Sequence, residues 1–403
     1  MGGINITEAN GQLGGVVTVQ DGIVGMVLTG VSEVGGYTLG APVLLTSLAD
    51  LTAAGITKAN NPFAYKHVSE FYSVAPVGSQ LYLMLVSDTM TIANISDNTN
   101  AAGAKVLYNF AAGKIKVMGL CTDDKAVHTG GGTITITNGL NADVYIAASN
   151  AKVMEAAFRA IQMPSRIIIG GSSYSGVASA LTDESTGTTN NKVAILIGDT
   201  QVWDATYPSA CIGLCLGKVA ASAVQEKISK VENGPLPNTV AYLGTVSISP
   251  SSGDPAIISG KNFITWRTFP QVQGFFFSGD TMLTTSLDDY EFLARGRTID
   301  KAHIITYAFL ISLVDADIPT VNGTITVGGN QVPAGLPDPG WVASTQQKVI
   351  TQLSNTMVAA GNCSSVSCFI DPAQDVRGTN TLKVVIIIDS VAYLMNINVN
   401  LGF

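Results

Sequence analysis

The sequence predicts a protein of the α/β (α+β) class, and two observations carry this prediction. From residue 41 to residue 231, apolar segments of strand length alternate with segments whose apolar residues have helical spacing. Such alternation is typical of a domain with a mixed sheet. The chain has 403 residues, more than one hydrophobic core usually supports, so we expect two domains or one domain with an insertion.

The first repeat of this alternation lies between residues 41 and 86. Residues 41–47 have the apolar content of a short buried strand, and Ser47 followed three positions later by Asp50 indicates a helix that begins with a capping box. Residues 62–73 have helical apolar spacing, and residues 80–86 are apolar and of strand length. Further strands are expected at 115–120, 166–169 and 192–198, and further helices near 153–161 and 209–231.

The composition excludes several classes of protein. Apolar residues make up 46% of the chain and charged residues only 12%, so we expect part of the surface to be covered by copies of the chain or by partners. The longest apolar runs, 304–314 and 384–388, are interrupted or too short for membrane insertion. The formal net charge of −8 argues against nucleic acid as a partner. No signal peptide is evident, so synthesis in the cytoplasm with reduced thiols is expected.

No pattern of residues specifies catalysis or metal binding. The five cysteines and three histidines lack ligand spacing, so no metal and no cofactor are predicted. Cys211 and Cys215 lie in an apolar helical run and are expected to be buried, and His67 is expected to be a packed core residue. The carboxylates at 123–124 and 288–289 are adjacent in sequence and therefore point apart. The sequence thus favours a protein that is not an enzyme.

An alternative from another class remains open, namely an α/β phosphate- or nucleotide-binding enzyme. Residues 170–176 form a Gly- and Ser-rich segment between a strand and a helix, where backbone N–H groups could hold phosphate. Asp199, at the end of the next strand, could then hold Mg²⁺. The segment lacks the Lys-Ser/Thr of a P-loop and does not fit the dinucleotide fingerprint or a nucleophile elbow. A plain strand-to-helix turn is the favoured interpretation.

Both ends of the chain have the character of extended β arms. Residues 16–28 contain two β-rich runs around the turn dipeptide Asp21-Gly22, which predicts either a strand offered to a partner or a terminal hairpin. Residues 382–401 contain two strands around Asp389-Ser390, and the second alternates apolar residues with Asn. A bare apolar edge of this kind is an aggregation hazard, so we expect it to have a partner.

The densest group of aromatic residues lies in residues 261–308 and is expected to form a core. It consists of Phe263, Trp266, Phe269, Phe275, Phe276 and Phe277. A charged helical segment follows, and within it Arg295, Arg297 and Lys301 predict a contacting face.

Three parts of the chain resemble contractile tail sheath proteins of phages, tailocins and related contractile injection systems. Residues 40–51 with the following helix and strand are similar to the N-terminal block of that family, and residues 371–382 with the closing strands to its C-terminal arm. Residues 295–302 also resemble a segment of compact sheaths. The aromatic stretch matches the sheath signature at Asn262, Arg267, Gly274, Phe277, Thr281 and Met282. It departs from that signature at Ser278 and Asp280, where many sheaths have Gly and Arg.

This resemblance implies an inner sheath domain built from both chain ends, with an inserted α/β middle domain and β-strand terminal arms. The implied divisions are an N-terminal arm and strand at 1–30, an α/β region with the inserted outer domain at 31–240, the inner domain at 241–381 and a C-terminal β arm at 382–403. Strands of the arms are expected to join neighbouring subunits. The residues assigned to these arms are Val16, Thr18, Ile23, Val27, Val385, Ile387, Ile397, Val399 and Leu401.

The resemblance also implies function and partners. The chain would polymerise helically around an inner tail tube protein as stacked hexameric rings, and contraction would drive the tube through a cell envelope. Arg295, Arg297 and Lys301 would face the tube. Baseplate and tail terminator proteins would be further partners, and assembly would occur in the bacterial cytoplasm as part of a virion tail or injection particle. Another self-assembling tube or shell protein is a second alternative.

Overall fold

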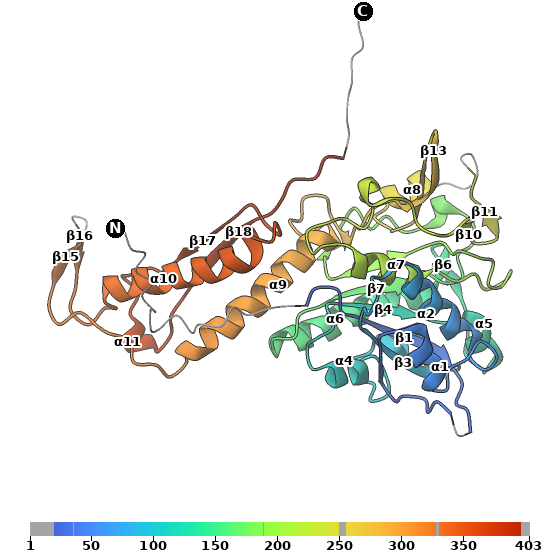
Figure 1. Ribbon diagram of the computed structural model, residues 1–403, viewed down its shortest axis with the longest axis horizontal. Coiled ribbons are helices and arrows are strands. Elements are labelled where there is room, and N and C mark those ends of the chain that lie inside the picture. Colours follow the sequence, from blue (N-terminus) through green and yellow to red (C-terminus); the bar gives the residue numbers. More distant parts are fainter. Residues whose placement is uncertain (1–19, 35, 188, 250–254, 328–329, 396–403) are drawn as a thin grey trace, which may run out of the picture. The chain divides into compact units, whose positions relative to one another are not determined.

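The computed structural model describes residues 20–34, 36–187, 189–249, 255–327 and 330–395 (Figure 1). These residues form two compact units, one of residues 20–303 and one that begins at residue 304. The α/β class predicted from the sequence is confirmed. Among the described residues, no helix is both long enough and apolar enough to cross a membrane.

The unit of residues 20–303 is built on a six-stranded sheet with the strand order β2-β3-β1-β4-β7-β9. Four of the strand pairings are parallel, and only β2 pairs antiparallel, with β3. The strands are β1 (Val24–Gly30), β2 (Val43–Leu45), β3 (Leu81–Ser87), β4 (Val117–Cys121), β7 (Arg166–Gly170) and β9 (Val193–Leu196). The central strands are buried along their length, as expected for a parallel sheet covered on both faces.

Helices cover both faces of this sheet. On one face α2 (Pro62–Val74) and α7 (Ile212–Ala221) pack against each other and on β1 and β4. On the other face lie α3 (Ile92–Ser96), α4 (Lys105–Ala111) and α6 (Ala142–Ala160). The predicted capping box is confirmed at α1 (Leu48–Ala53), because the Ser47 and Asp50 side chains each bond the other residue's backbone N–H.

Shorter elements complete this unit. They are α5 (Asp124–Thr129), β5 (Ile136–Thr137), β6 (Leu140–Asn141), η1 (Ala178–Ala180), β8 (Thr189–Asn190), η2 (Val231–Asn233), β10 (Tyr242–Leu243), β11 (Val246–Ser247), α8 (Pro255–Gly260), β12 (Trp266–Phe269), β13 (Val272–Phe277) and β14 (Leu283–Thr284).

The aromatic stretch contributes to the core of this unit as predicted, although not with all of its rings. Trp266 in β12 stacks on Phe277 in β13 with ring centroids 5.5 Å apart, and its Nε1–H donates to the carbonyl of Tyr242. Phe263 and Phe276 are also buried. Phe269 and Phe275 are only half-buried, because they lie toward the tip of the β12–β13 hairpin.

The second unit contains the end of α9 (Leu293–Leu310), η3 (Ile311–Leu313), β15 (Ile325–Val327), β16 (Asn330–Val332), α10 (Pro339–Leu353), the π-helical turn η4 (Ser354–Val358), β17 (Ser365–Phe369), α11 (Val376–Thr379) and β18 (Val385–Asp389). The apolar side of α10 and η4 is buried, with Val342, Val349, Leu353 and Met357 inside. Gly361 follows η4 with φ +69°, which a glycine adopts without strain.

Candidate functional site: the β17–β18 sheet and a neighbouring groove

The outer face of the β17–β18 sheet carries apolar side chains that the described residues leave exposed. The two strands are antiparallel, with Phe369 opposite Val385 and Ser367 opposite Ile387. These two pairs lie on the exposed face, where Phe369 and Ile387 are each 57% exposed. The alternate residues form the inner face, which is more buried, and β17 packs against α10. The sheet therefore has one supported face and one bare apolar face.

Within the described residues β18 has a neighbour on one edge only. Its partner is β17, and the sheet has two strands. The N–H and C=O groups on the other edge of β18 point away from the sheet, so they can accept a further strand. A two-stranded sheet is marginal by itself, and an added strand would supply backbone hydrogen bonds along that edge.

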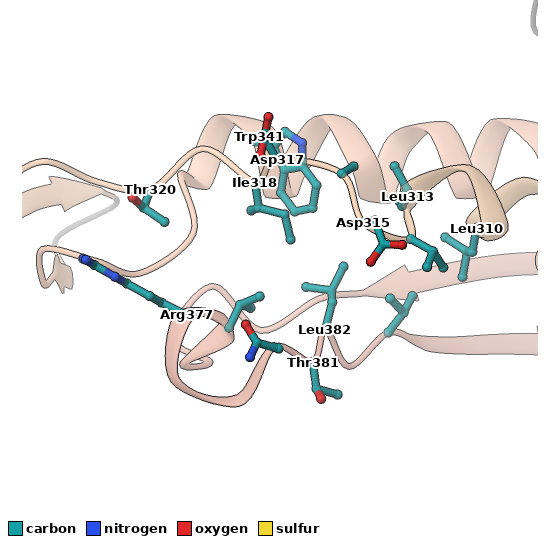
Figure 2. A pocket seen from close by; sticks show the side chains of 15 residues that line it. Leu310, Leu313, Asp315, Asp317, Ile318, Thr320, Trp341, Arg377, Thr381 and Leu382 are labelled. Carbon is teal, nitrogen blue, oxygen red and sulfur yellow. The ribbon is translucent and has the colours of Figure 1, made fainter.

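Beside this sheet lies an apolar groove of about 780 Å³ (Figure 2). Trp341, Ile318 and Leu313 line one wall, and Leu382 lines the opposite wall and points toward them. The full lining is Leu310, Leu313, Val314, Asp315, Ala316, Asp317, Ile318, Thr320, Trp341, Val376, Arg377, Asn380, Thr381, Leu382 and Val384. A groove of this size falls within the range of sites that hold drug-sized ligands or a few side chains.

Hydrogen bonds fix one wall of the groove. Residues 319–321 are joined to residues 335–338 by backbone bonds, including Asp338 N to Pro319 O at 2.8 Å and Val321 N to Leu336 O at 2.9 Å. Asp338 also caps α10 by accepting from Trp341 N at 2.9 Å. The position of the Trp341 ring is thus set by the start of its helix.

The opposite wall is fixed through Gln374. Its amide oxygen accepts from Lys383 N at 2.8 Å, and its Nε2–H₂ donates to Asp371 O at 3.0 Å. The Asp375 side chain caps α11 by accepting from Gly378 N at 2.7 Å. Because both walls are held by local hydrogen bonds, the groove is already formed in the single chain.

The structure corrects the prediction that Arg297 and Lys301 face a tube. Both side chains are buried within residues 20–303. Arg297 donates to the carbonyls of Ser222 and Ala223, and Lys301 Nζ forms an ion pair with Asp21 at 2.6 Å. A charge held in this way is not available to a partner. Arg295 is half-buried, with its guanidinium 5.3 Å from the centre of the Phe292 ring.

The predicted arm residues have three different outcomes. For Val27 and Ile23 the prediction is wrong, since β1 is hydrogen-bonded to β3 and β4 on its two edges and both side chains are buried. The hairpin alternative for residues 16–28 is wrong over the described residues for the same reason. Val385 and Ile387 lie on the bare face of β18. The other predicted arm residues, Val16, Thr18, Ile397, Val399 and Leu401, lie outside the described residues.

The Gly- and Ser-rich segment at 170–176 is poorly suited to bind a phosphate group. The hydroxyls of Ser172 and Ser173 donate to the buried Asp124 carboxylate at 2.7 and 2.5 Å, and Asn141 donates to the same oxygen. An anion bound beside these serines would meet that negative charge. The geometry therefore favours the interpretation of a plain turn. In the described part of the chain, no group of three or more His, Cys, Asp or Glu side chains could hold a metal ion.

Asp199, the other residue of the enzyme alternative, lies in a buried cluster with Lys66, His67 and Glu70 of α2. Lys66 Nζ is 2.6 Å from Asp199 and 3.1 Å from Glu70, and His67 Nδ1 is 3.6 Å from Glu70. Burial would raise the pKa of Glu70, but Lys66 beside it lowers that pKa to about 2. Burial, reinforced by Lys66, lowers the pKa of His67. His67 is a core residue, as predicted.

We expect mild acid to destabilise residues 20–303 through this cluster. The pKa of His67 is depressed below its ordinary value of 6.5, so the folded state resists its protonation and stability falls as the pH drops below 6.5. The depressed pKa of Glu70 acts in the same direction at lower pH. For His67 the loss at pH 5 is at most about 2 kcal/mol, from about 1.4 kcal/mol for each pH unit.

The measurement is the difference between the melting midpoints at pH 7 and pH 5. His67→Leu should reduce this difference. His128→Leu, which removes an exposed histidine, should leave it unchanged. An undiminished difference in His67→Leu would show that the acid effect arises elsewhere.

A second buried charge network, which the sequence did not reveal, joins α9 to β7 and α6. Asp300 accepts two bonds from the Arg166 guanidinium, from Nε at 2.7 Å and from Nη2 at 3.0 Å, and it also pairs with Arg159 at 2.7 Å. Arg166 is fully buried. Gly296 makes room for it, because a Cβ at that position would lie 2.7 Å from the guanidinium carbon. The network fixes α9 on the sheet.

Comparison with known proteins gives one family and one fold. A family model described as "DUF2586, N-terminal domain" matches residues 1–281. No curated protein matches this chain.

Three solved structures are similar to the chain along nearly all of its length. One is described as the helical sheath of the anti-feeding prophage in its contracted state, with 12% identity, coverage of 99% of this chain and 98% of the other, and a TM-score of 0.59. Another is the sheath complex of an extracellular contractile injection system in its contracted state, with 11% identity, 100% and 97% coverage and a TM-score of 0.59. A sheath tail protein from Listeria innocua has 9% identity, 94% coverage of both chains and a TM-score of 0.51. The chain has the fold that these sheath proteins share.

Proposed function

The chain belongs to the family described as DUF2586, N-terminal domain, and we propose that it is a structural subunit of a contractile tail sheath. The observation that carries this proposal is the β17–β18 sheet, with its open edge and bare apolar face. The fold shared with sheath proteins supports it. In this proposal the chain has no catalytic role and requires no cofactor.

Assembly follows from the geometry of β18. A strand from a second copy adds to the open edge of β18, where its apolar side chains pack beside Val385 and Ile387. The donor strand and the acceptor edge are different surfaces, so the contact is head-to-tail. Head-to-tail contacts that do not close on one ring generate a helical array. Stacked hexameric rings around an inner tail tube protein are the array we propose, with baseplate and tail terminator proteins at its ends.

Contraction would then be a rearrangement of subunits within a connected lattice. The array would form in the bacterial cytoplasm and belong to a phage tail or an injection particle, in which it drives the tube through a cell envelope. Arg295 remains our candidate for contact with the tube. The division into an N-terminal arm (1–30), a region with the inserted domain (31–240), an inner domain (241–381) and a C-terminal arm (382–403) is likewise part of the proposal.

We expect Ile387→Asp to abolish tube formation while the single chain stays folded. The Ile387 side chain is 57% exposed, so an aspartate there costs the monomer little, whereas in an assembled sheet it would be buried without a partner. The measurement is negative-stain electron microscopy of concentrated protein, with circular dichroism to verify folding.

Val153→Asp is the matched control. It places the same charge at an apolar side chain that is 62% exposed on α6, in the other unit, and should leave striated tubes intact. Normal tubes from Ile387→Asp would contradict the role assigned to β18. Unassembled protein from the unaltered chain under all conditions would contradict the sheath proposal itself.

A further inference from the structure

Lys192, the residue before β9, has a side-chain amine beside a second fixed cation. Its Nζ atom lies over the ring of Tyr290, 5.2 Å from the ring centre, and the Arg166 guanidinium lies over the same ring at 5.8 Å. The Lys192 side chain is half-buried. Within the described residues, this amine has no hydrogen-bond acceptor and no carboxylate at ion-pair distance.

Backbone hydrogen bonds hold Lys192 in this position. Its carbonyl accepts from Ile167 N at 3.0 Å, and the carbonyl of the preceding residue, Asn191, accepts from Arg166 Nη1 at 2.6 Å. Arg166 is itself fully buried and bound to Asp300. Neither Lys192 nor the guanidinium can therefore move away from the other without breaking these bonds.

The carboxylates around Lys192 are engaged by other groups. Asp300 and Glu155 are both paired with Arg159, at 2.7 and 2.6 Å, and Asp300 is also paired with Arg166. Asp288, in the turn before α9, accepts two bonds from the Asn191 amide at 3.1 and 2.9 Å. These carboxylates attract the Lys192 ammonium, but each is already bound to a different donor.

Burial and the two arginines favour the neutral form of the Lys192 amine. Burial disfavours the ammonium most, Arg166 and Arg159 repel it, and the carboxylates offset only part of this, so the pKa of Lys192 falls from 10.5 to about 8. At pH 7 about a tenth of such amines are neutral, against about one in 3,000 at the ordinary value. The neutral amine is the nucleophilic form of lysine, and desolvation beside another cation activates it.

Other partly buried lysines of the described chain differ from Lys192 in their contacts. Burial also lowers the pKa of Lys116 and Lys218, but their amines donate to the carbonyls of Gly113 and Asn233. An acceptor of this kind stabilises the ammonium form. The combination of partial burial, fixed neighbouring cations and an amine without such an acceptor singles out Lys192.

We propose that Lys192 is a site of covalent modification, at which its amine takes an acyl group from an acyl phosphate. The Nζ lone pair attacks the carbonyl carbon and a C–N bond forms. The C–O bond to the phosphate breaks, the phosphate leaves with the electron pair of that bond, and the amine releases a proton to water. The product amide is neutral, so it no longer repels Arg166. This inference is independent of the proposed sheath function.

Acetylation of the full chain by acetyl phosphate at pH 7 tests the proposal, with peptide mass spectrometry to measure the initial rate at each lysine. The references are the exposed Lys58, in the same unit, and the exposed Lys348, on α10. Nucleophilic strength falls with pKa, as it does for thiols, so the expected ratio of rates is smaller than the ratio of neutral fractions. We expect the rate at Lys192 to be at least tenfold above either reference, although Lys192 is the least exposed of the three.

The pH profile and a pair of variants identify the cause. The rate at Lys192 should level off above about pH 8. Arg159→Gln removes a guanidinium whose side chain is 24% exposed, and it should lower the rate at Lys192 several-fold and move the levelling to higher pH. Arg159→Lys keeps the positive charge and should react almost as the unaltered chain does. Circular dichroism verifies that both variants are folded, and the pH profile of the unaltered chain decides if Arg159→Gln does not fold.

Several results would overturn the proposal. One is a rate at Lys192 no greater than the rate at Lys58 or Lys348. Another is a rate at Lys192 that rises when the chain is unfolded in urea, because the fold would then shield the amine instead of activating it. A rate that still climbs steeply between pH 9 and pH 10 would contradict the predicted neutral amine. An equal loss of rate in both Arg159 variants would show that packing, and not charge, sets the reactivity.

Discussion

Gly213→Ala should destabilise residues 20–303 by about 2 kcal/mol or more, although alanine is normally the better helix former. Gly213 lies in the first turn of α7, where α7 packs against α2. A Cβ at this position would fall on the backbone carbonyl of His67, which cannot rotate away as a side chain could. Overpacking of a rigid contact typically costs about 1–3 kcal/mol and occasionally more, against a helix-propensity gain of only about 1 kcal/mol.

Gly217, one turn later, faces the same helix. Its added Cβ would lie 2.7 Å from the carbonyl oxygen of Phe71, so Gly217→Ala should be destabilising as well, though less so. Gly260 is the matched control, since it ends α8 and its Cβ would have no atom within 4 Å. Chemical denaturation measures all three variants. If Gly213→Ala were as stable as Gly260→Ala, α7 could shift away from α2 at no cost, and the close helix contact would not be a requirement of the fold.

Asp300→Ala should cost about 3–5 kcal/mol, the usual penalty for leaving a buried charge without its partner. The carboxylate is the shared acceptor of Arg159 and the fully buried Arg166. Burial alone would raise the pKa of Asp300, but the two guanidiniums lower it. Its contribution to stability is therefore present above the ordinary carboxyl range and is lost as the pH falls through the lowered pKa.

Glu232→Ala is the control for Asp300→Ala, because it removes a carboxylate whose side chain is 82% exposed and paired with Lys230. Exposed ion pairs contribute about 0–1 kcal/mol, so this variant should unfold almost as the unaltered protein does. The same small effect in Asp300→Ala would mean that water reaches Arg166 once the carboxylate is gone, and the network would then be less enclosed than its geometry indicates.

Local patterns in the sequence were sufficient wherever a structure depends on near neighbours. The capping box at Ser47 and Asp50 involves groups three residues apart, and the strand at 81–87 and the helix at 62–74 follow from apolar spacing. The apolar character of β18 was also visible in the sequence, because residues 384–388 form a continuous apolar β-prone run whatever they pair with. These features determined the α/β class and the part of the proposed assembly surface that lies on β18.

Features that depend on distant partners were not visible in the sequence. The charged residues of α9 predicted a face that contacts a partner. Instead, Lys301 pairs with Asp21, 280 positions away, and Arg297 donates to Ser222, 75 positions away. Similarly, residues 16–28 had the pattern of an arm. In the structure β1 is an interior strand of the six-stranded sheet, because β3 and β4 pair with its two edges. Burial of a charge or a strand is set by what packs against it, and no local pattern records this.

The sequence by itself therefore determined the fold class, the absence of any catalytic or metal-ligand pattern, and an exposed β-prone segment near the C-terminus. Only the tertiary structure decided which charged side chains are buried and paired within the fold, which described β segment keeps an open edge, and where the groove beside Trp341 lies. The physical reason is that each of these properties depends on contacts between elements far apart in the chain, and those contacts exist only in the folded molecule.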